Sequence, residues 1–235
     1  MLFCCNLYVK YPSLIHSLYK GFDAGIWPIY FTSSPPNSPT LLLHPEAYQD
    51  MVSNEFKKGC YIGPCTRREV EALIGPFQSS PLSWVPKPGK YRAVHNFSHP
   101  HTPTSTILSI NASIDADLFP CTWGTFATVS HIIYNLLTGS QAAIRDVAEA
   151  YHTSPITPEQ WPGLVVKLLD DDQFAINTCN NLGLTSAGGI YGQLGDAMLD
   201  IFCAQGIGPT SKWVNDHIFF RVPGTRPTLF SLYSL

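Results

Sequence analysis

One stretch decides the fold: residues 142–152 read Ala-Ala-Ile-Arg-Asp-Val-Ala-Glu-Ala-Tyr-His. Its first half, Ala142 to Val147, is a short apolar run that is typical of a β-strand. The residues after it, up to Tyr151, are typical of a helical turn. The strand therefore carries a carboxylate, Asp146, at its end.

A second carboxylate lies at a strand end much later in the chain. Trp213 to Val222 is a predicted strand pair, with Asn215 and Asp216 at its tip. Mg²⁺ prefers carboxylate and phosphate oxygens, and a two-metal nucleotidyl transfer holds two ions about 4 Å apart between acidic residues. Asp146 and Asp216 are therefore candidate metal ligands.

Further elements follow from local signals along the chain. Pro45 opens and Gly59 closes a helix over 46–56, and Thr66 with Glu69 has the spacing of a capping box before a second helix. The remaining predicted elements are strands at 82–85 and 91–97 joined by a Pro-Lys-Pro-Gly-Lys turn, helices over 122–137 and 186–202, and a hairpin of 164–169 and 174–179 around the aspartates 170–172. We interpret those aspartates as a solvated turn.

The composition is that of a folded protein. The 235 residues are 45% hydrophobic, 12% aromatic and 13% charged, and twenty prolines argue against an all-helical fold. No apolar run approaches the roughly 18 residues of a membrane span. The N-terminal MLFCCNLYV has no basic start, which argues against a signal peptide. We expect an intracellular chain, in the nucleus or the cytoplasm, without a membrane partner.

Charge is distributed unevenly. Residues 56–100 carry seven basic and two acidic side chains, a net +5, while the whole chain is −3 and the remainder therefore −8. A basic block beside an acidic remainder fits a nucleic-acid surface next to a metal pocket, and a solvated charged face is the alternative.

The seven cysteines form an odd, scattered set without a CxxC pair, which favours free intracellular thiols over a disulfide framework. A zinc site of Cys60, Cys65, His95 and His99 is a further alternative, although its spacing is at the edge of the usual range.

Four ordered motifs resemble those of reverse transcriptases, and of the tyrosine-recombinase (DIRS-like) retroelements in particular. They lie at residues 80–98 (Ser-Pro-Leu-Ser-Trp-Val-Pro-Lys, then Lys-Tyr-Arg-Ala-Val-His-Asn-Phe-Ser from 90), 145–159, 181–187 (Asn-Leu-Gly-Leu-Thr-Ser-Ala) and 213–216 (Trp-Val-Asn-Asp). The last falls where the family has an aromatic-x-Asp-Asp turn.

The resemblance implies roles residue by residue. Asp146 and Asp216 bind two Mg²⁺ or Mn²⁺ ions, and Lys87 and Arg92 contact the triphosphate of the incoming dNTP. Tyr151 lies under the sugar as a steric gate. Leu182 and Gly183 flank the nucleotide and the RNA or DNA template of the template-primer. The alternatives are structural: Tyr151 is a core aromatic residue, and Lys87 and Arg92 are exposed charges of the hairpin.

The sequence departs from the family at Asn215, where the family has a second shared carboxylate. An amide offers a neutral oxygen, so we expect the second metal to bind poorly and polymerase activity to be lost or severely impaired. The chain also stops resembling the family after Arg221, which indicates a truncated domain without a thumb.

The resemblance implies an α+β fold of the polymerase right-hand type, with an antiparallel palm sheet backed by two long apolar helices and a partial fingers subdomain. We expect an irregular leader (1–45), a fingers-like region (46–140), a palm-like region (141–222) and a tail (223–235). The expected function is nucleotidyl transfer from dNTP to a primer. The alternatives are a non-catalytic nucleic-acid-binding remnant and an unselected retroelement fragment. The sequence carries no indication of oligomeric state.

Overall fold

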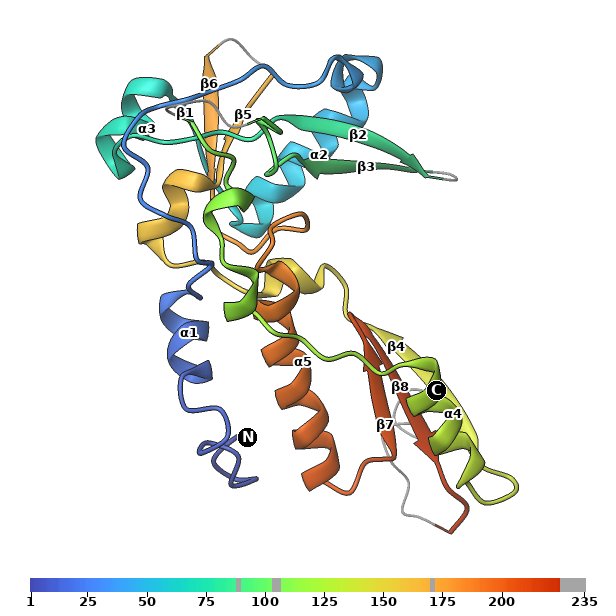
Figure 1. The fold of residues 1–235 in the computed structure, drawn as a ribbon. Coiled ribbons are helices and arrows are strands. Elements are labelled where there is room, and N and C mark those ends of the chain that lie inside the picture. The colour runs from blue at the N-terminus through green and yellow to red at the C-terminus, as the bar shows by residue number, and fades with distance from the viewer. Residues whose placement is uncertain (88–89, 103–106, 170–171, 225–235) are drawn as a thin grey trace. The chain divides into compact units, whose positions relative to one another are not determined.

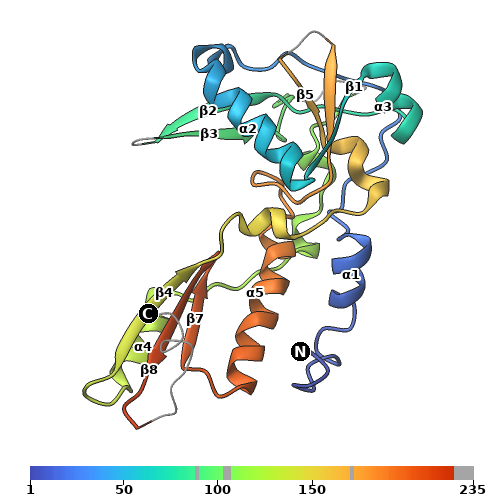
Figure 2. The same cartoon turned by 180° about the vertical axis from the view of Figure 1, so that it is seen from behind.

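The computed structural model describes residues 1–87, 90–102, 107–169 and 172–224 (Figures 1 and 2). The chain divides into two compact units. Unit 1 combines Met1–Ile15, Pro120–Ala150 and the chain from Tyr191 onward, and unit 2 combines His16–Phe119 with Tyr151–Ile190. Each unit is therefore assembled from segments that are distant in the sequence.

Unit 2 contains two small antiparallel sheets. Strands β1 (Tyr61–Thr66), β6 (Gln173–Asn177) and β5 (Val165–Lys167) form one, in the order β1-β6-β5. Strands β2 (Leu82–Lys87) and β3 (Lys90–His95) form a separate hairpin. Its helical elements are α2 (Pro45–Lys58), α3 (Arg67–Ile74), most of α1 (Leu14–Lys20), and the 3₁₀ helices η1 (Pro39–Leu43), η2 (Asn111–Ser113), η3 (Ala116–Leu118) and η5 (Pro158–Gly163).

Helix α2 begins at Pro45 and ends before Gly59 as the sequence predicts, and α3 begins after Thr66 as predicted. Pro45 stands at the start of α2, and Gly59 ends it in the left-handed conformation with φ 76°. The Thr66–Glu69 capping box is present in both directions: the Thr66 hydroxyl accepts from the Glu69 N–H, and the Glu69 carboxylate accepts from the Thr66 N–H at 2.7 Å.

The capping box gives a stability prediction. Thr66→Ala removes the hydroxyl acceptor for one otherwise unpaired helix N–H, and we expect it to lower the free energy of unfolding by about 1 kcal/mol. Urea unfolding followed by circular dichroism measures this. Thr66→Ser keeps the hydroxyl and is expected to unfold near the natural midpoint, whereas an equal loss in both variants would show that the cap is not the cause.

The core of unit 2 consists of two clusters on the β1-β6-β5 sheet. One contains the buried Leu41, Tyr48, Cys60, Leu82 and Cys179 among others. The other contains Val70, Phe77, Val165, Phe174 and Ile176, with the Phe77 and Phe174 rings edge to face at 5.2 Å. Strands β5 and β6 are therefore mostly buried, whereas β1 is exposed over most of its length.

Unit 1 contains the three-stranded antiparallel sheet β4-β8-β7, formed by β4 (Gln141–Asp146), β8 (Asp216–Arg221) and β7 (Thr210–Trp213). Helix α5 (Ala187–Ala204) starts in unit 2, and from Tyr191 it belongs to unit 1. There Phe202 packs on Phe219 of β8, with ring centroids 5.1 Å apart. The other helix of this unit is α4 (Phe126–Tyr134).

Three predictions for element boundaries are wrong. The leader 1–45 is not irregular throughout, because it contains α1 and η1. The helix predicted over 122–137 extends only from Phe126 to Tyr134: Thr125 caps its start, and it has no buried residue. Within the described ranges, α5 is the one long apolar helix, so the expected pair of long apolar helices is reduced to one. The predicted turn at Ala148–Tyr151 is the 3₁₀ helix η4 (Ala150–Thr153).

The hairpin predicted around the aspartates 170–172 is present as β5 and β6, although residues 170 and 171 lie outside the described ranges. None of the helices within those ranges has the length and apolar character needed to cross a lipid bilayer.

Candidate functional site

The structure brings the two predicted metal-binding carboxylates of unit 1 together. Strands β4 and β8 pair antiparallel in a register that sets Asp146 directly opposite Asp216. Asp146 is exposed and Asp216 half-buried. Directly opposed residues in an antiparallel pair have Cβ atoms about 4.5–5.5 Å apart, so both carboxylates lie within reach of one divalent ion.

The turn next to this pair is tight and strained. Val214 and Asn215 form the two-residue connection between β7 and β8, because Trp213 pairs with Asp216. Val214 has a φ of 54°, in the left-handed region that β-branched residues rarely adopt. The Val147 N–H donates to the Asn215 carbonyl at 2.9 Å and holds the turn against β4. Backbone strain of this kind is common at functional sites.

The Asn215 side chain points at the acidic pair. Its amide nitrogen donates to Asp146 Oδ1 and, at 3.3 Å, to the Val147 carbonyl. Both neighbours are acceptors, which fixes the amide with its NH₂ group toward Asp146. The amide thus directs a donor at an oxygen that a metal ion needs. Two carboxylates and an amide fit one divalent ion, and they do not fit the pair of closely spaced ions of a two-metal centre.

A buried cation supports the strand behind the turn. Lys212 on β7 is 2% exposed, and its ammonium lies 2.9 Å from Asp196 of α5 and 4.4 Å from the Trp123 ring centre. It also donates to the Gly192 carbonyl at 3.2 Å. Next to Asp216, burial lowers the pKa of His217, with Lys212 contributing in the same direction and Asp216 opposing it. His217 is therefore neutral at neutral pH.

The other five predicted site residues belong to unit 2 or to its boundary. Lys87 and Arg92 lie on the β2–β3 hairpin, where Lys87 pairs with Lys90 and Arg92 with Val85. Arg92 is exposed. Tyr151 is a half-buried residue of η4. The structure thus brings Asp146, Asn215 and Asp216 together in unit 1 and carries the remaining five residues in unit 2.

Leu182 and Gly183 lie in the turn before α5, and Leu182 is exposed. Gly183 has a φ of 110°, and a side chain there would meet the His95 carbonyl at 3.1 Å, so glycine is needed. Asn111 holds this turn: its amide donates to the Gly183 carbonyl and accepts from the Thr185 N–H, each at 2.9 Å. Sequence patterns do not identify Asn111 as a residue of this region, because a single asparagine in a loop belongs to no recognisable motif.

His95 lies in the same region as Gly183. Burial, with a smaller contribution from the nearby His152, lowers the pKa of His95 to about 4. His95 is therefore a neutral ring at neutral pH, stacked on Phe97 with centroids 5.4 Å apart. His95 therefore packs on Phe97, in contrast to the zinc-binding role that the alternative zinc site assigns to it.

The zinc alternative of Cys60, Cys65, His95 and His99 is wrong for the described residues, which do not gather these four ligands. Cys60 belongs to the cluster with Leu41 and Cys179, whereas Cys65 packs against the cluster with Val70 and Phe77. All seven cysteines lie in the described ranges, and all are free.

Solved structures similar to this chain include those of foamy viral protease-reverse transcriptases. The native prototype foamy virus protease-reverse transcriptase matches with a TM-score of 0.54 and 16% identity, over 82% of this chain and 21% of that one. The foamy viral enzyme in complex with an RNA/DNA hybrid has a TM-score of 0.56 at 15% identity, over 89% of this chain and 24% of its own. A third structure, the dRH form with double-stranded DNA, has a TM-score of 0.52 at 16% identity, over 88% and 29%.

No protein-family model and no curated protein matches the sequence. The chain spans less than a third of the length of these three solved neighbours. At 15–16% identity the likeness concerns the fold. With its helices, its antiparallel sheets and these neighbours, the chain has a reverse transcriptase-like fold.

Proposed function

We propose that this chain is a reverse transcriptase-like domain that binds an RNA or DNA template-primer, with a nucleotidyl-transfer site one carboxylate short of a two-metal centre. The observation that carries the proposal is the register of β4 and β8, which sets Asp146 opposite Asp216 beside the β7–β8 turn. In this assignment unit 1 carries the palm and unit 2 the fingers of a retroelement polymerase, of the DIRS-like type by its motifs.

Asp146 and Asp216 would hold one Mg²⁺ or Mn²⁺ ion. Such an ion polarises a phosphoryl oxygen and neutralises charge that develops in the transition state. The second ion lacks its ligand, because Asn215 supplies an amide donor to Asp146 instead of a negative oxygen. Polymerase activity is therefore lost or reduced by several orders of magnitude, and nucleic-acid binding does not depend on this residue.

The unit 2 residues take the nucleotide-binding roles. Lys87 and Arg92 bind the triphosphate of a dNTP, Tyr151 excludes a 2′-hydroxyl, and Leu182 with Gly183 flanks the nucleotide and template. Arg92 is exposed, and so is Gly183, which has no side chain; both properties support these roles. A guanidinium binds phosphate in a bidentate manner, and a glycine lets a ligand approach the backbone closely.

Template-primer binding tests the proposal through the basic block of residues 56–100, in which Arg92 is an exposed arginine. In the absence of dNTP, we expect Arg92→Gln to weaken template-primer binding and to reduce the slope of log K against log salt by about 1, because one phosphate contact of this block is removed. Fluorescence anisotropy of a labelled primer-template across a salt series measures both quantities.

Arg67→Gln is the matched control for Arg92→Gln. Arg67 is an exposed arginine of the same unit, but Glu71 lies 3.1 Å from it and already neutralises its charge. We expect this variant to keep the natural salt slope. Absence of binding by the natural chain at low salt would contradict the proposed function. Equal salt slopes for both variants would show that Arg92 does not contact the nucleic acid.

A non-catalytic nucleic-acid-binding remnant is the second candidate, and the Asn215 amide favours it. The two candidates differ in one result. Restoring a carboxylate at position 215 rescues primer extension in an impaired polymerase, and in a binding remnant it changes neither extension nor affinity.

A further inference from the structure

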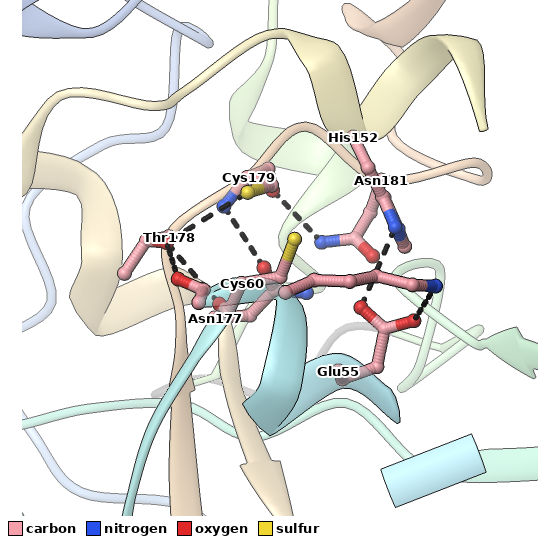
Figure 3. A network of polar contacts seen from close by, with 9 residues as sticks. Glu55, Cys60, His152, Asn177, Thr178, Cys179 and Asn181 are labelled. Atoms are coloured by element: carbon pink, nitrogen blue, oxygen red, sulfur yellow. Dashed lines mark hydrogen bonds and ion pairs between the residues drawn. The ribbon is translucent and has the colours of Figure 1, made fainter. Parts of the chain in front are cut away.

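Three potential metal ligands of unit 2 lie together outside the proposed nucleotidyl-transfer site. One ligand atom each from Glu55, Cys60 and His152 can be chosen so that all lie within 4.8 Å of one another (Figure 3). Across the described ranges, this is the one group of three histidine, cysteine or acidic side chains arranged in this way. It combines a carboxylate, a thiol and an imidazole, which are the three ligand types that Zn²⁺ accepts.

The end of α2 sets two of these ligands side by side. The Gly59 N–H bonds to the Phe56 carbonyl at 3.0 Å, and the Cys60 N–H bonds to the Glu55 carbonyl at 3.1 Å. With Gly59 left-handed, this is a Schellman motif. The two residues that this motif brings into contact are usually both apolar. Here they are Glu55 and Cys60, so a charged group occupies a position that normally belongs to the core.

The Glu55 carboxylate is buried and only one of its oxygens is paired. Its side chain is 10% exposed, and the Lys58 ammonium donates to Oε1 at 3.4 Å as an ion pair. Oε2 lies 3.4 Å from His152 Nδ1, yet neither of these two buried atoms has a hydrogen-bond partner in the described part of the chain. A buried polar atom without a partner is costly, and a cation bound between Oε2 and Nδ1 would satisfy both.

A second thiol completes the surroundings. Cys179 is also buried and lies in the same core cluster as Cys60 (Figure 3). The backbone of Cys179 is fixed on both sides: its N–H donates to Asn177 Oδ1 at 2.9 Å, and its carbonyl accepts from Asn181 Nδ2 at 3.1 Å (Figure 3). Polar groups that orient ligands from outside the coordination sphere are common around metal sites.

We infer that Glu55, Cys60 and His152, with Cys179 as the fourth ligand, form a structural site for a zinc-class divalent cation. Zn²⁺ bonds of about 2.0–2.3 Å in a tetrahedron separate the ligand atoms by roughly 3.3–3.8 Å. The 3.4 Å between Glu55 Oε2 and His152 Nδ1 already matches this separation. The chosen atoms of Glu55, Cys60 and His152 lie within 4.8 Å of one another, so a small closure brings them to this separation, and a movement of the neighbouring Cys179 thiol completes the tetrahedron.

Such an ion would join the end of α2, the η4 helix and the segment that follows β6 within unit 2. It would explain why a buried carboxylate, an imidazole and two thiols gather in an otherwise apolar cluster. The inference does not depend on nucleotidyl transfer, since none of the four residues belongs to the proposed catalytic set.

Cobalt binding to the purified full chain tests the inference. Co²⁺ replaces Zn²⁺ in tetrahedral sites, and a thiolate ligand adds a charge-transfer band in the near ultraviolet. We expect one equivalent of Co²⁺ to produce this band and Zn²⁺ to displace it. Cys60→Ser is expected to reduce the band, the double variant Cys60→Ser/Cys179→Ser to abolish it, and His152→Asn to weaken Co²⁺ affinity at least about 10-fold.

Cys65→Ser is the matched control, because Cys65 lies on β1, the strand that follows Cys60, but packs against the other core cluster. We expect it to keep the band, as we expect of Asp146→Asn, which affects only the proposed catalytic ion. Absence of the band in the natural reduced chain, an undiminished band in Cys60→Ser, or persistence of the band in Cys60→Ser/Cys179→Ser would overturn the inference.

A second measurement needs no substitution and covers the case in which Cys60→Ser does not fold. Alkylation of the natural chain with N-ethylmaleimide, read by peptide mass spectrometry, is expected to be slowed by Zn²⁺ at Cys60 and Cys179 and unchanged at Cys65. Equal labelling with and without Zn²⁺, or a Cys60–Cys179 disulfide in place of the two thiols, would contradict the site.

Discussion

Asn215→Asp is expected to raise magnesium-dependent primer extension by at least about 100-fold over the natural chain. The amide of Asn215 donates a hydrogen bond to Asp146, and aspartate would replace that donor with a negative oxygen. Opposed carboxylates repel one another until a cation lies between them, so the change favours metal binding. Charge stabilisation by a correctly placed ion contributes several kcal/mol to phosphoryl transfer, which corresponds to rate factors of this size.

Extension of a primed RNA template under a magnesium titration measures the effect. Asn215→Ala is the matched control, since it removes the hydrogen bond to Asp146 without adding charge. We expect it to remain as slow as the natural chain. An equal gain in the alanine variant would show that the hydrogen bond, and not the missing charge, limits the site.

Asp196→Ala is expected to lower the free energy of unfolding by about 2–4 kcal/mol, the larger of the two stability effects predicted for this chain. The ammonium of Lys212 is 2% exposed and has the Asp196 carboxylate at 2.9 Å. Removing one partner of a buried pair leaves an uncompensated charge and costs about 3–5 kcal/mol, which the 40% exposure of Asp196 reduces. Urea unfolding measures the change.

Lys10→Gln provides the comparison for Asp196→Ala. The Lys10 ammonium lies 2.5 Å from the carboxylate of Asp200, which is on α5 like Asp196. The Lys10 side chain, however, is 61% exposed. An exposed pair contributes at most about 1 kcal/mol, so this variant is expected to remain close to the natural stability. Similar losses in both variants would mean that the burial of Lys212 does not determine the cost.

Local signals predicted most of the fold. The α2 and α3 helices follow from Pro45, Gly59 and the Thr66–Glu69 spacing, since caps and breakers act within one turn of the chain. The β4 strand and the β7–β8 turn follow from short apolar runs with polar residues at their ends. The adjacency of Asp146 and Asp216 was inferred from motif order, and the β4–β8 register is what sets them opposite each other.

The features that sequence reasoning missed depend on tertiary packing. The contacts that bury Lys212 against Asp196 and bring Glu55 to His152 are between residues that are distant in the sequence. No local sequence pattern predicts such contacts. The Schellman motif after Glu55 can be inferred from Gly59, but the sequence does not show which side chain faces the Glu55 carboxylate. Helix α4 was predicted too long because apolar periodicity continues beyond the residues that its cap and its end allow.

The most direct test of the proposed site is a double-mutant cycle in primer extension with magnesium, comparing the natural chain, Asn215→Asp, Asp146→Asn and the double variant. We predict a large gain for Asn215→Asp alone and its complete loss when Asp146→Asn is added, because both carboxylates hold the same ions. The proposed nucleotidyl-transfer site would be contradicted if Asn215→Asp extended no faster than the natural chain, or if its gain persisted without Asp146.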